Sequence, residues 1–222
     1  MEKKYKLTEE TINVNGRTLY RIEALKDFND VKKGDKGGYV EDEENLSQSG
    51  DCWVYGGAMV YGKARVLDNA EILDNVVVYD SAEVYGNAKI CGDAMVYGNA
   101  EVYENAVIGG DAEVYGNAKI CGDAKICGDA MVYGNAEVYD KAIVCGDTMV
   151  YGNAEVYGSA EVFGKAKVSD NAEVFGNAKI CGDAMVYGNA EVFGNAEVYN
   201  DAIVCGDMVV CGDAVVCGQA KK

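Results

Sequence analysis

A six-residue alternation of apolar and polar positions runs through most of the chain. Val or Ile stands at every sixth position from Val54 to Val216, and Ala stands four positions later in nearly every repeat. Residues two apart on an extended segment point to the same side, so each Ala and the Val or Ile that follows it share one inward face. The Gly-Asn or Gly-Asp pair between repeats predicts a tight corner. Strands this short must stack on one another, and the pattern therefore predicts a β-solenoid.

Sorting the repeats by eighteen positions instead of six separates their residues into three columns. The first column holds most of the inward isoleucines, namely Ile72, Ile90, Ile108, Ile126 and Ile180. The second holds outward methionines beside tyrosines, and the third holds outward glutamates beside Tyr and Phe. Such sorting is expected when three repeats close one triangular coil, because like residues then stack directly. Copying of an eighteen-residue unit would give a similar pattern, but the methionine column resumes in phase at Met131 after an inserted repeat.

We therefore predict an all-β fold, a single-stranded triangular β-helix with eighteen residues per coil. About nine coils at ~4.8 Å per strand make a rod roughly 45 Å long. The core of Ala and Val is too narrow to hold a cofactor, and we expect none. Periodicity alone does not fix the hand of the coil.

Residues 1–49 do not follow the repeat. Two segments of alternating polarity flank Asn15-Gly16, which predicts a β-hairpin. The glycine-rich segment Lys33–Tyr39 lacks the residue order of a phosphate-binding loop, and we interpret it as a turn. Leu46 falls in register with the inward alanines.

The chain then divides into a hairpin and capping segment (1–49), the β-solenoid (50–220) and a short tail (221–222). The capping segment would cover the strand edges of the first coil, which would otherwise promote aggregation. Trp53, which points outward on that coil, is expected to pack against the cap.

The formal net charge of −17 lies mostly on the repeats. An acidic rod repels phosphates, so direct binding of nucleic acid is excluded as a function. Solubility is one explanation for the charge, because it keeps strand edges and flat faces apart. The other is that the rod imitates a nucleic acid and occupies the groove of a basic protein.

Neither a membrane span nor a signal peptide is indicated, because no apolar run approaches the length of a span and the first residues are polar. We expect a cytoplasmic protein without a membrane partner. The nine cysteines fit this expectation as reduced thiols that act as small apolar residues. Cys127 and Cys145 stack one coil apart, so a disulfide between them is geometrically allowed.

The N-terminal segment carries a family resemblance. Leu19–Phe28, Val31–Val40, Asn45–Ser47 and Cys52–Gly56 resemble the leader of the YdcK-like hexapeptide-repeat proteins. The resemblance extends over nearly the whole chain, because the repeats cover the rest. It implies a left-handed β-helix in the cytoplasm with no established reaction. Some members of the family are labelled transferases or polymer-forming cytoskeletal proteins.

Catalytic chemistry finds little support in the residue types. Hexapeptide acyltransferases, which share the repeat pattern, use a histidine as general base, and related carbonic anhydrases bind zinc through histidines. This chain contains no histidine, so the usual base and the commonest zinc ligand are both missing. The few serines form no nucleophile constellation. We assign no catalytic, cofactor-binding or metal-binding residue and lean against an enzyme, although a transferase stays open.

Two surfaces are candidates for binding other proteins. The first is the outward apolar column, which is interrupted by Glu113 and Lys167 and comprises Met59, Tyr61, Met95, Tyr97, Met131, Tyr133, Met149, Tyr151, Met185 and Tyr187. Such a strip can serve docking, or its side chains can simply stack to stabilise the sheet. The second is the last coil, where outward charges give way to Ile203, Cys205, Val209, Cys211, Val215 and Cys217.

We therefore predict a non-catalytic scaffold or protein-binding β-solenoid that forms a homo-oligomer through the apolar face or the C-terminal coil. The first alternative is an acidic decoy for a basic partner protein, and the second is a transferase. The outward glutamate column is interpreted as a solvated face, with weak recruitment of cations or a basic partner as the alternative.

Overall fold

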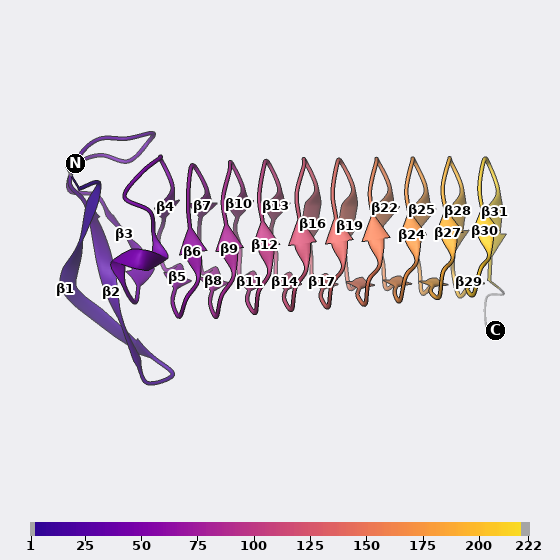
Figure 1. The fold of residues 1–222 in the computed structure, drawn as a ribbon, viewed down its shortest axis with the longest axis horizontal. Coiled ribbons are helices and arrows are strands. Elements are labelled where there is room, and N and C mark those ends of the chain that lie inside the picture. Colours follow the sequence, from indigo (N-terminus) through magenta and orange to yellow (C-terminus); the bar gives the residue numbers. More distant parts are fainter. Residues whose placement is uncertain (1–2, 219–222) are drawn as a thin grey trace.

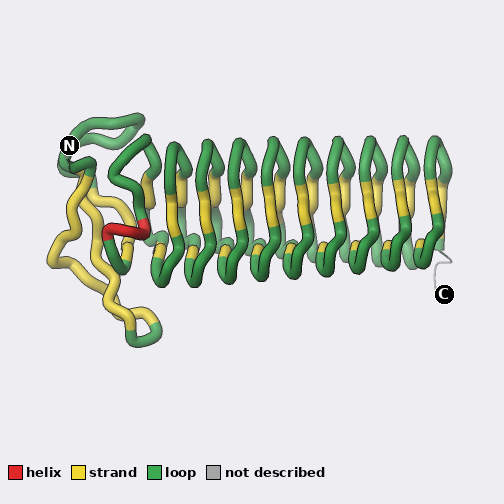
Figure 2. The backbone as a smooth tube through the Cα atoms, viewed as in Figure 1, coloured by secondary structure: helices red, strands yellow, loops and turns green. Residues whose placement is uncertain are grey.

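The computed structural model describes residues 3–218, which form a straight rod of stacked triangular coils with a β-hairpin at its N-terminal end (Figure 1). Three strands alternate with corners in each coil, and the one short helix of the described chain, the 3₁₀ helix η1 (Glu43–Asn45), lies beside the first coil (Figure 2). Equivalent strands of successive coils pair in parallel. Met95, for example, pairs with Val77 on one side and with Glu113 on the other. The predicted triangular coil of eighteen residues is confirmed, while its left-handed sense stays a prediction.

The three sides of the triangle are three long sheets. The twelve-stranded sheet starts with β1 (Tyr5–Val14), β2 (Arg17–Ala24) and β3 (Lys36–Val40), and continues with β5 (Met59–Val60), β8 (Val77–Val78), β11 (Met95–Val96), β14 (Glu113–Val114), β17 (Met131–Val132), β20 (Met149–Val150), β23 (Lys167–Val168), β26 (Met185–Val186) and β29 (Ile203–Val204). The ten-stranded sheet holds β4 (Trp53–Val54), β7 (Glu71–Ile72), β10 (Lys89–Ile90), β13 (Val107–Ile108), β16 (Lys125–Cys127), β19 (Ile143–Cys145), β22 (Glu161–Val162), β25 (Lys179–Ile180), β28 (Glu197–Tyr199) and β31 (Val215–Cys217). The nine-stranded sheet holds β6 (Arg65–Val66), β9 (Glu83–Val84), β12 (Glu101–Val102), β15 (Lys119–Ile120), β18 (Glu137–Val138), β21 (Glu155–Val156), β24 (Glu173–Val174), β27 (Glu191–Val192) and β30 (Val209–Val210).

The core is a thin column of small side chains. The inward Ala and Val or Ile residues are fully buried along the rod, from Val54 to Val204. Backbone bonds between coils complete the packing; the Met95 amide, for instance, donates to the Ala112 carbonyl at 2.9 Å. Thr148 takes the place of an inward alanine, and its Oγ1 is buried without a hydrogen-bond partner.

The corners need residues that tolerate a positive φ. Glycine fills most of them, and a Cβ on Gly98 would lie 2.9 Å from the Gly116 backbone nitrogen of the next coil. Where the solenoid corner residue is not glycine it is Asp, Glu or Asn, and five of the acidic ones bind the amide of the next corner. Asp140 (φ 59°) accepts a 3.1 Å hydrogen bond from the Gly158 amide in this way. At these corners the carboxylate adds a hydrogen bond between coils that a glycine could not supply.

The asparagines that follow the corner glycines form hydrogen-bonded rows along the rod. Asn99 Nδ2 donates to Asn117 Oδ1 at 3.0 Å, and the same bond repeats coil by coil until the row ends at Asp207. Asp207, the last residue of the row, needs only to accept a hydrogen bond, which its carboxylate does well. The rows add side-chain hydrogen bonds to the backbone ladders of the sheets.

The N-terminal segment extends the twelve-stranded sheet. β1 and β2 pair antiparallel across Asn15 and Gly16, both of which have positive φ. The interpretation of Lys33–Tyr39 as a turn is wrong for its second half, because β3 pairs with β2 and with β5. Its glycines are required by packing, since a Cβ on Gly37 would lie 2.5 Å from the Val54 carbonyl oxygen.

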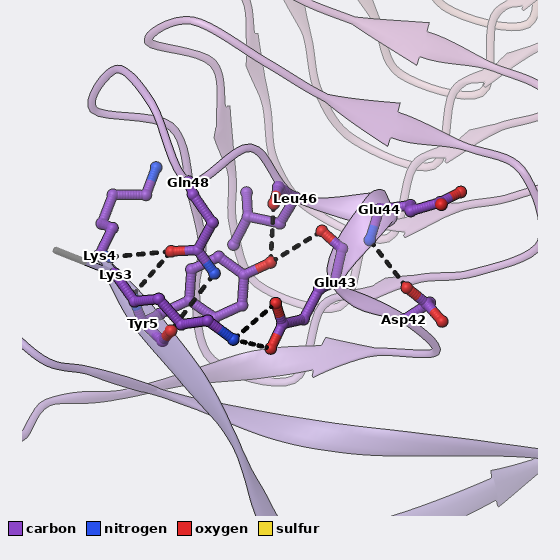
Figure 3. Close-up of polar contacts among 8 residues, drawn as sticks. All are labelled: Lys3, Lys4, Tyr5, Asp42, Glu43, Glu44, Leu46 and Gln48. Carbon is purple, nitrogen blue, oxygen red and sulfur yellow. Dashed lines mark hydrogen bonds and ion pairs between the residues drawn. The ribbon is translucent and has the colours of Figure 1, made fainter. Parts of the chain in front are cut away.

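Leu46 also differs from the prediction. It forms a parallel bridge with Val66, so it occupies the place of an inward Val rather than that of an inward Ala. The chain between Leu46 and Val54 is two residues longer than in a regular repeat, and the extra length lets Gln48 reach the cap. Gln48 Oε1 accepts a hydrogen bond of 2.8 Å from the Lys4 amide (Figure 3).

The cap is fixed to the first coil by buried polar and aromatic contacts. Tyr5 donates its phenolic hydrogen to the Leu46 carbonyl at 2.7 Å (Figure 3). Lys4 is buried, and its Nζ donates to the Cys52 carbonyl at 2.8 Å, while desolvation lowers the pKa of this amine. Trp53 is buried and packs edge-to-face against Tyr5 and Phe28, at centroid distances of 6.2 and 5.3 Å. The prediction that Trp53 packs against the N-terminal segment is confirmed.

One cysteine pair differs from the expectation of reduced thiols. Cys127 and Cys145 lie opposite each other on β16 and β19 and form a disulfide, with their Cα atoms 4.6 Å apart. Parallel strands of neighbouring coils bring them together because they occupy the same column. The other seven cysteines are free thiols.

Candidate functional site

The predicted apolar face lies on the twelve-stranded sheet, where the structure brings its residues together. Met59, Met95, Met131, Met149 and Met185 stand outward on β5, β11, β17, β20 and β26, and the paired tyrosines follow each strand at the same corner. All five methionines are half-buried. Tyr61 is only 9% exposed, whereas Tyr187 reaches 36%. The face is thus more covered by its own side chains than the sequence suggested.

The tyrosines on this face stack as one continuous row of six rings, which we call the tyrosine ladder: Tyr61, Tyr79, Tyr97, Tyr115, Tyr133 and Tyr151. Neighbouring ring centroids lie 4.8 to 5.3 Å apart and the ring planes are close to parallel. The row is interrupted at Ser169, so Tyr187 has no neighbouring tyrosine ring in the column. Ring stacking between coils stabilises the sheet, which is the alternative to docking that the sequence left open for this face.

Glu113, which interrupts the methionine column, is bound by the tyrosine ladder. The Tyr97 hydroxyl donates to Glu113 Oε2 at 3.1 Å. Desolvation, together with this carboxylate, raises the pKa of the Tyr97 phenol. The bond also shows how this ring lies, because Tyr97 leans toward the outward residue of the next coil.

The same contact explains the glutamate column on the nine-stranded sheet. Tyr139 donates to Glu155 at 2.9 Å and Tyr157 donates to Glu173 at 3.0 Å, in each case across one coil. Stacked carboxylates repel one another, and a phenol donor offsets part of that cost. Sequence reasoning missed these pairs. The signal was available, because Glu stands sixteen positions after Tyr in each of them.

The second candidate surface, the C-terminal coil, is much more exposed. Ile203, Val209 and Val215 are 47%, 57% and 58% exposed, and Met208 is 45% exposed although it occupies an inward position. Beside them Cys205 is half-buried, while Cys211 and Cys217 are exposed. Four of the six large apolar side chains that are exposed in the described chain therefore lie in one coil.

The strands of this coil are also sheet edges. β29, β30 and β31 each stand at the end of their sheet, so one side of their backbone has no pairing strand among residues 3–218. The opposite end of the rod differs. There β3 pairs with β5 and Leu46 bridges Val66, while β4, which also ends its sheet, carries the buried Trp53 and Val54. Within residues 3–218, exposed apolar side chains and unpaired backbone thus coincide at the C-terminal coil alone.

A hollow of about 780 Å³ lies where the hairpin meets the first coils. Its walls carry charges of both signs that are partly engaged with one another. Arg17 binds Glu41 at 2.9 Å, and the same carboxylate accepts a 2.8 Å hydrogen bond from the Gly62 amide. These contacts hold the hairpin to the coil. In the part of the chain that the structure describes, no three His, Cys, Asp or Glu side chains converge as a metal site.

No helix among residues 3–218 has the length and apolar character of a membrane span.

Lys4 is a further residue that sequence reasoning missed, because a lysine near the start of a polar segment gives no sign that it will be buried.

Comparisons with known proteins agree with the resemblance drawn from the sequence. The family model described as the YdcK beta solenoid repeat matches residues 88–104 and 124–140. A protein of Escherichia coli (strain K12) named "Uncharacterized acetyltransferase YdcK" is 49% identical to this chain over 37 residues. That match covers 17% of this chain and 11% of the relative, so it spans only a small part of the relative's length. Both findings support a YdcK-like assignment for the repeats.

Proposed function

We propose that this chain, which matches the YdcK β-solenoid repeat over residues 88–104 and 124–140, is a non-catalytic scaffold that associates with a second copy of itself through its C-terminal coil. The observation that carries the proposal is the coincidence of exposed Val209 and Val215 with the edges of β30 and β31, which no strand within residues 3–218 pairs. Contiguous apolar surface favours burial in an interface, and an unpaired strand edge favours pairing with another strand. We also propose a cytoplasmic location, which the resemblance to YdcK-like proteins implies.

A second copy satisfies both requirements at once. Two C-terminal coils related by a two-fold axis perpendicular to the rod meet with their strands antiparallel, so each unpaired edge finds hydrogen-bonding groups on the other copy. Stacking onto the N-terminal end is disfavoured, since the cap already covers the first coil. Two rods joined in this way would present their hairpins at opposite ends.

Mass photometry of the full chain tests the proposal. Replacing Val209 and Val215 with lysine places charges on the contact, and we expect the dimer population to be lost. Phe163→Lys is the matched control, because Phe163 is 39% exposed in the middle of the rod and should leave the dimer intact. A wild-type chain that is monomeric at micromolar concentration, or a double variant that dimerises equally well, contradicts the proposal.

An acidic decoy is the second candidate, favoured by the net charge of −17. In that role a basic protein would bind along the rod and be released by salt. The discriminating measurement is capture of a nucleic-acid-binding protein at low ionic strength with release at high ionic strength.

A transferase is the third candidate and rests on the name of the Escherichia coli relative. Calorimetry with acetyl-CoA tests it, and heat of binding saturating below millimolar ligand would support an enzyme. Without such binding the scaffold proposal stands.

A further inference from the structure

We propose that the tyrosine ladder is a site of one-electron oxidation at which neighbouring coils become covalently joined through dityrosine. The ladder places five consecutive tyrosine pairs with their ring centroids 4.8 to 5.3 Å apart and their planes within 13° of parallel. Two phenoxyl radicals formed on such a pair already lie face to face, and the rings then turn out of the parallel stack as the carbon–carbon bond is completed. The backbone holds the pair together, because each partner lies one coil from the next in paired strands.

The ladder is accessible to a small oxidant. Tyr79, Tyr97, Tyr115, Tyr133 and Tyr151 are half-buried, so part of each ring meets solvent. Trp53, the only tryptophan, is 1% exposed beneath the cap and is shielded from collision with the oxidant. Once the exposed thiols of Cys211 and Cys217 are alkylated, radicals are expected to form on the partly exposed phenols of the rod, where the ladder holds the longest unbroken row of them.

Glu113 supplies a proton acceptor inside the ladder. A phenol that loses an electron becomes a strong acid, and Tyr97 already donates its hydroxyl hydrogen to the Glu113 carboxylate at 3.1 Å. The proton can move along this bond as the electron leaves, which favours oxidation of Tyr97 over the other tyrosines of the ladder. Tyr79 and Tyr115 stack on either side of it at 4.8 Å.

The reaction balances with hydrogen peroxide as the oxidant. Each of two tyrosines loses one electron and one proton, and a bond forms between the ring carbons ortho to the two oxygens. The hydrogen on each coupled carbon then moves to its phenolic oxygen, which restores both aromatic rings. Hydrogen peroxide accepts the two electrons and two protons and leaves as two molecules of water.

The experiment uses the full chain at submicromolar concentration with a peroxidase and hydrogen peroxide, or with a photo-oxidised ruthenium complex where the peroxidase is too bulky. Dityrosine is followed by its fluorescence, and the joined peptides are identified by mass spectrometry. We expect cross-links within one chain, between tyrosines eighteen residues apart in the ladder. Yield per chain should not depend on protein concentration.

An alternating variant separates the ladder from ordinary tyrosine oxidation. Replacing Tyr79, Tyr115 and Tyr151 with phenylalanine keeps the stacked rings but leaves no two neighbouring phenols, so cross-links in the ladder should disappear. The matched control replaces three tyrosines outside the ladder, namely Tyr20, Tyr187 and Tyr199, with phenylalanine and should retain them. Circular dichroism verifies that both variants fold.

Three outcomes overturn the proposal. One is a wild-type chain that yields only cross-links between chains, and another is a set of joined peptides with no preference for tyrosines eighteen residues apart, the spacing of the stacked pairs. The third is an equal yield of the same dityrosine cross-links after unfolding in urea, because the cross-links would then not depend on the folded coils.

Discussion

Tyr157 donates a 3.0 Å hydrogen bond to Glu173, the outward residue of the next coil on the nine-stranded sheet. The following coil lacks this bond, because Phe175 stands where a phenol would reach Glu191. Phe175 stacks on Tyr157 at a centroid distance of 4.8 Å, so its ring already has the orientation that the bond requires.

The first prediction is that Phe175→Tyr stabilises the rod. A phenol donor to Glu191 should raise the free energy of unfolding by about 1 kcal/mol, as expected for a hydrogen bond to a partly exposed carboxylate. Urea denaturation followed by circular dichroism measures the change. Phe193→Tyr is the control, since the outward residue of its next coil is Val209, and it should gain nothing. Equal effects of the two variants would count against the Tyr–Glu contact as the cause.

The second prediction concerns alkaline pH. Desolvation, followed by the neighbouring carboxylates, raises the pKa of Tyr85 and of Tyr157 to about 12. A raised pKa means that the folded chain holds the phenolic proton more tightly than the unfolded chain does. The stability from this preference is therefore complete below the ordinary tyrosine pKa of about 10, and it is lost as the pH rises toward 12.

We expect the free energy of unfolding to fall between pH 10 and about pH 12, with a shallower fall in Tyr157→Phe. Denaturation midpoints across this range measure the slope. A Tyr157→Phe slope as steep as that of the wild type would exclude this phenol as a contributor.

The third prediction is that Thr148→Val stabilises the core. The Thr148 hydroxyl is buried without a partner among alanines and valines, which costs about 1–3 kcal/mol relative to an apolar group of the same shape. Valine keeps the shape and removes the unpaired group. Thr148→Ser keeps the hydroxyl and loses a methyl group, so it should destabilise the rod. Thermal denaturation of the three proteins should rank valine first and serine last, and any other order opposes this explanation.

The fourth prediction is that reduction weakens the middle of the rod. The disulfide between Cys127 and Cys145 closes a loop with a sequence separation of 18, and loss of such a constraint typically costs about 3 kcal/mol. Dithiothreitol should therefore lower the denaturation midpoint of the wild type. A chain with both cysteines replaced by serine should not respond. Thiol titration that finds both residues free before reduction would contradict the cross-link.

The repeat was predictable because each inward position requires the same small range of volumes. Val96 and Val114 can stack one coil apart only if every coil has the same length, so the sequence must repeat every eighteen residues. The outward columns follow from the same period, and the tyrosine ladder needed only the sorting to be found.

The N-terminal capping segment was less predictable because its sequence occurs once and does not follow the repeat. Gly37 lies in a strand, since the Val54 carbonyl leaves no room for a Cβ, and no local signal marks that contact. Lys4 is buried because the first corner offers it backbone carbonyls. The C-terminal coil was found from its loss of outward charge, whereas the low exposure of the Met and Tyr face follows from rings that lean onto the next coil.

Hydrogen–deuterium exchange of the full chain at low and high protein concentration tests the central proposal most directly. Association through the C-terminal coil predicts that amides of Ile203, Val209 and Val215 become protected as concentration rises. Amides in the middle of the rod, such as that of Met131, should exchange at the same rate throughout, because the Thr148 carbonyl already accepts its hydrogen bond at 2.9 Å. Equal exchange of the C-terminal amides at both concentrations would contradict the account.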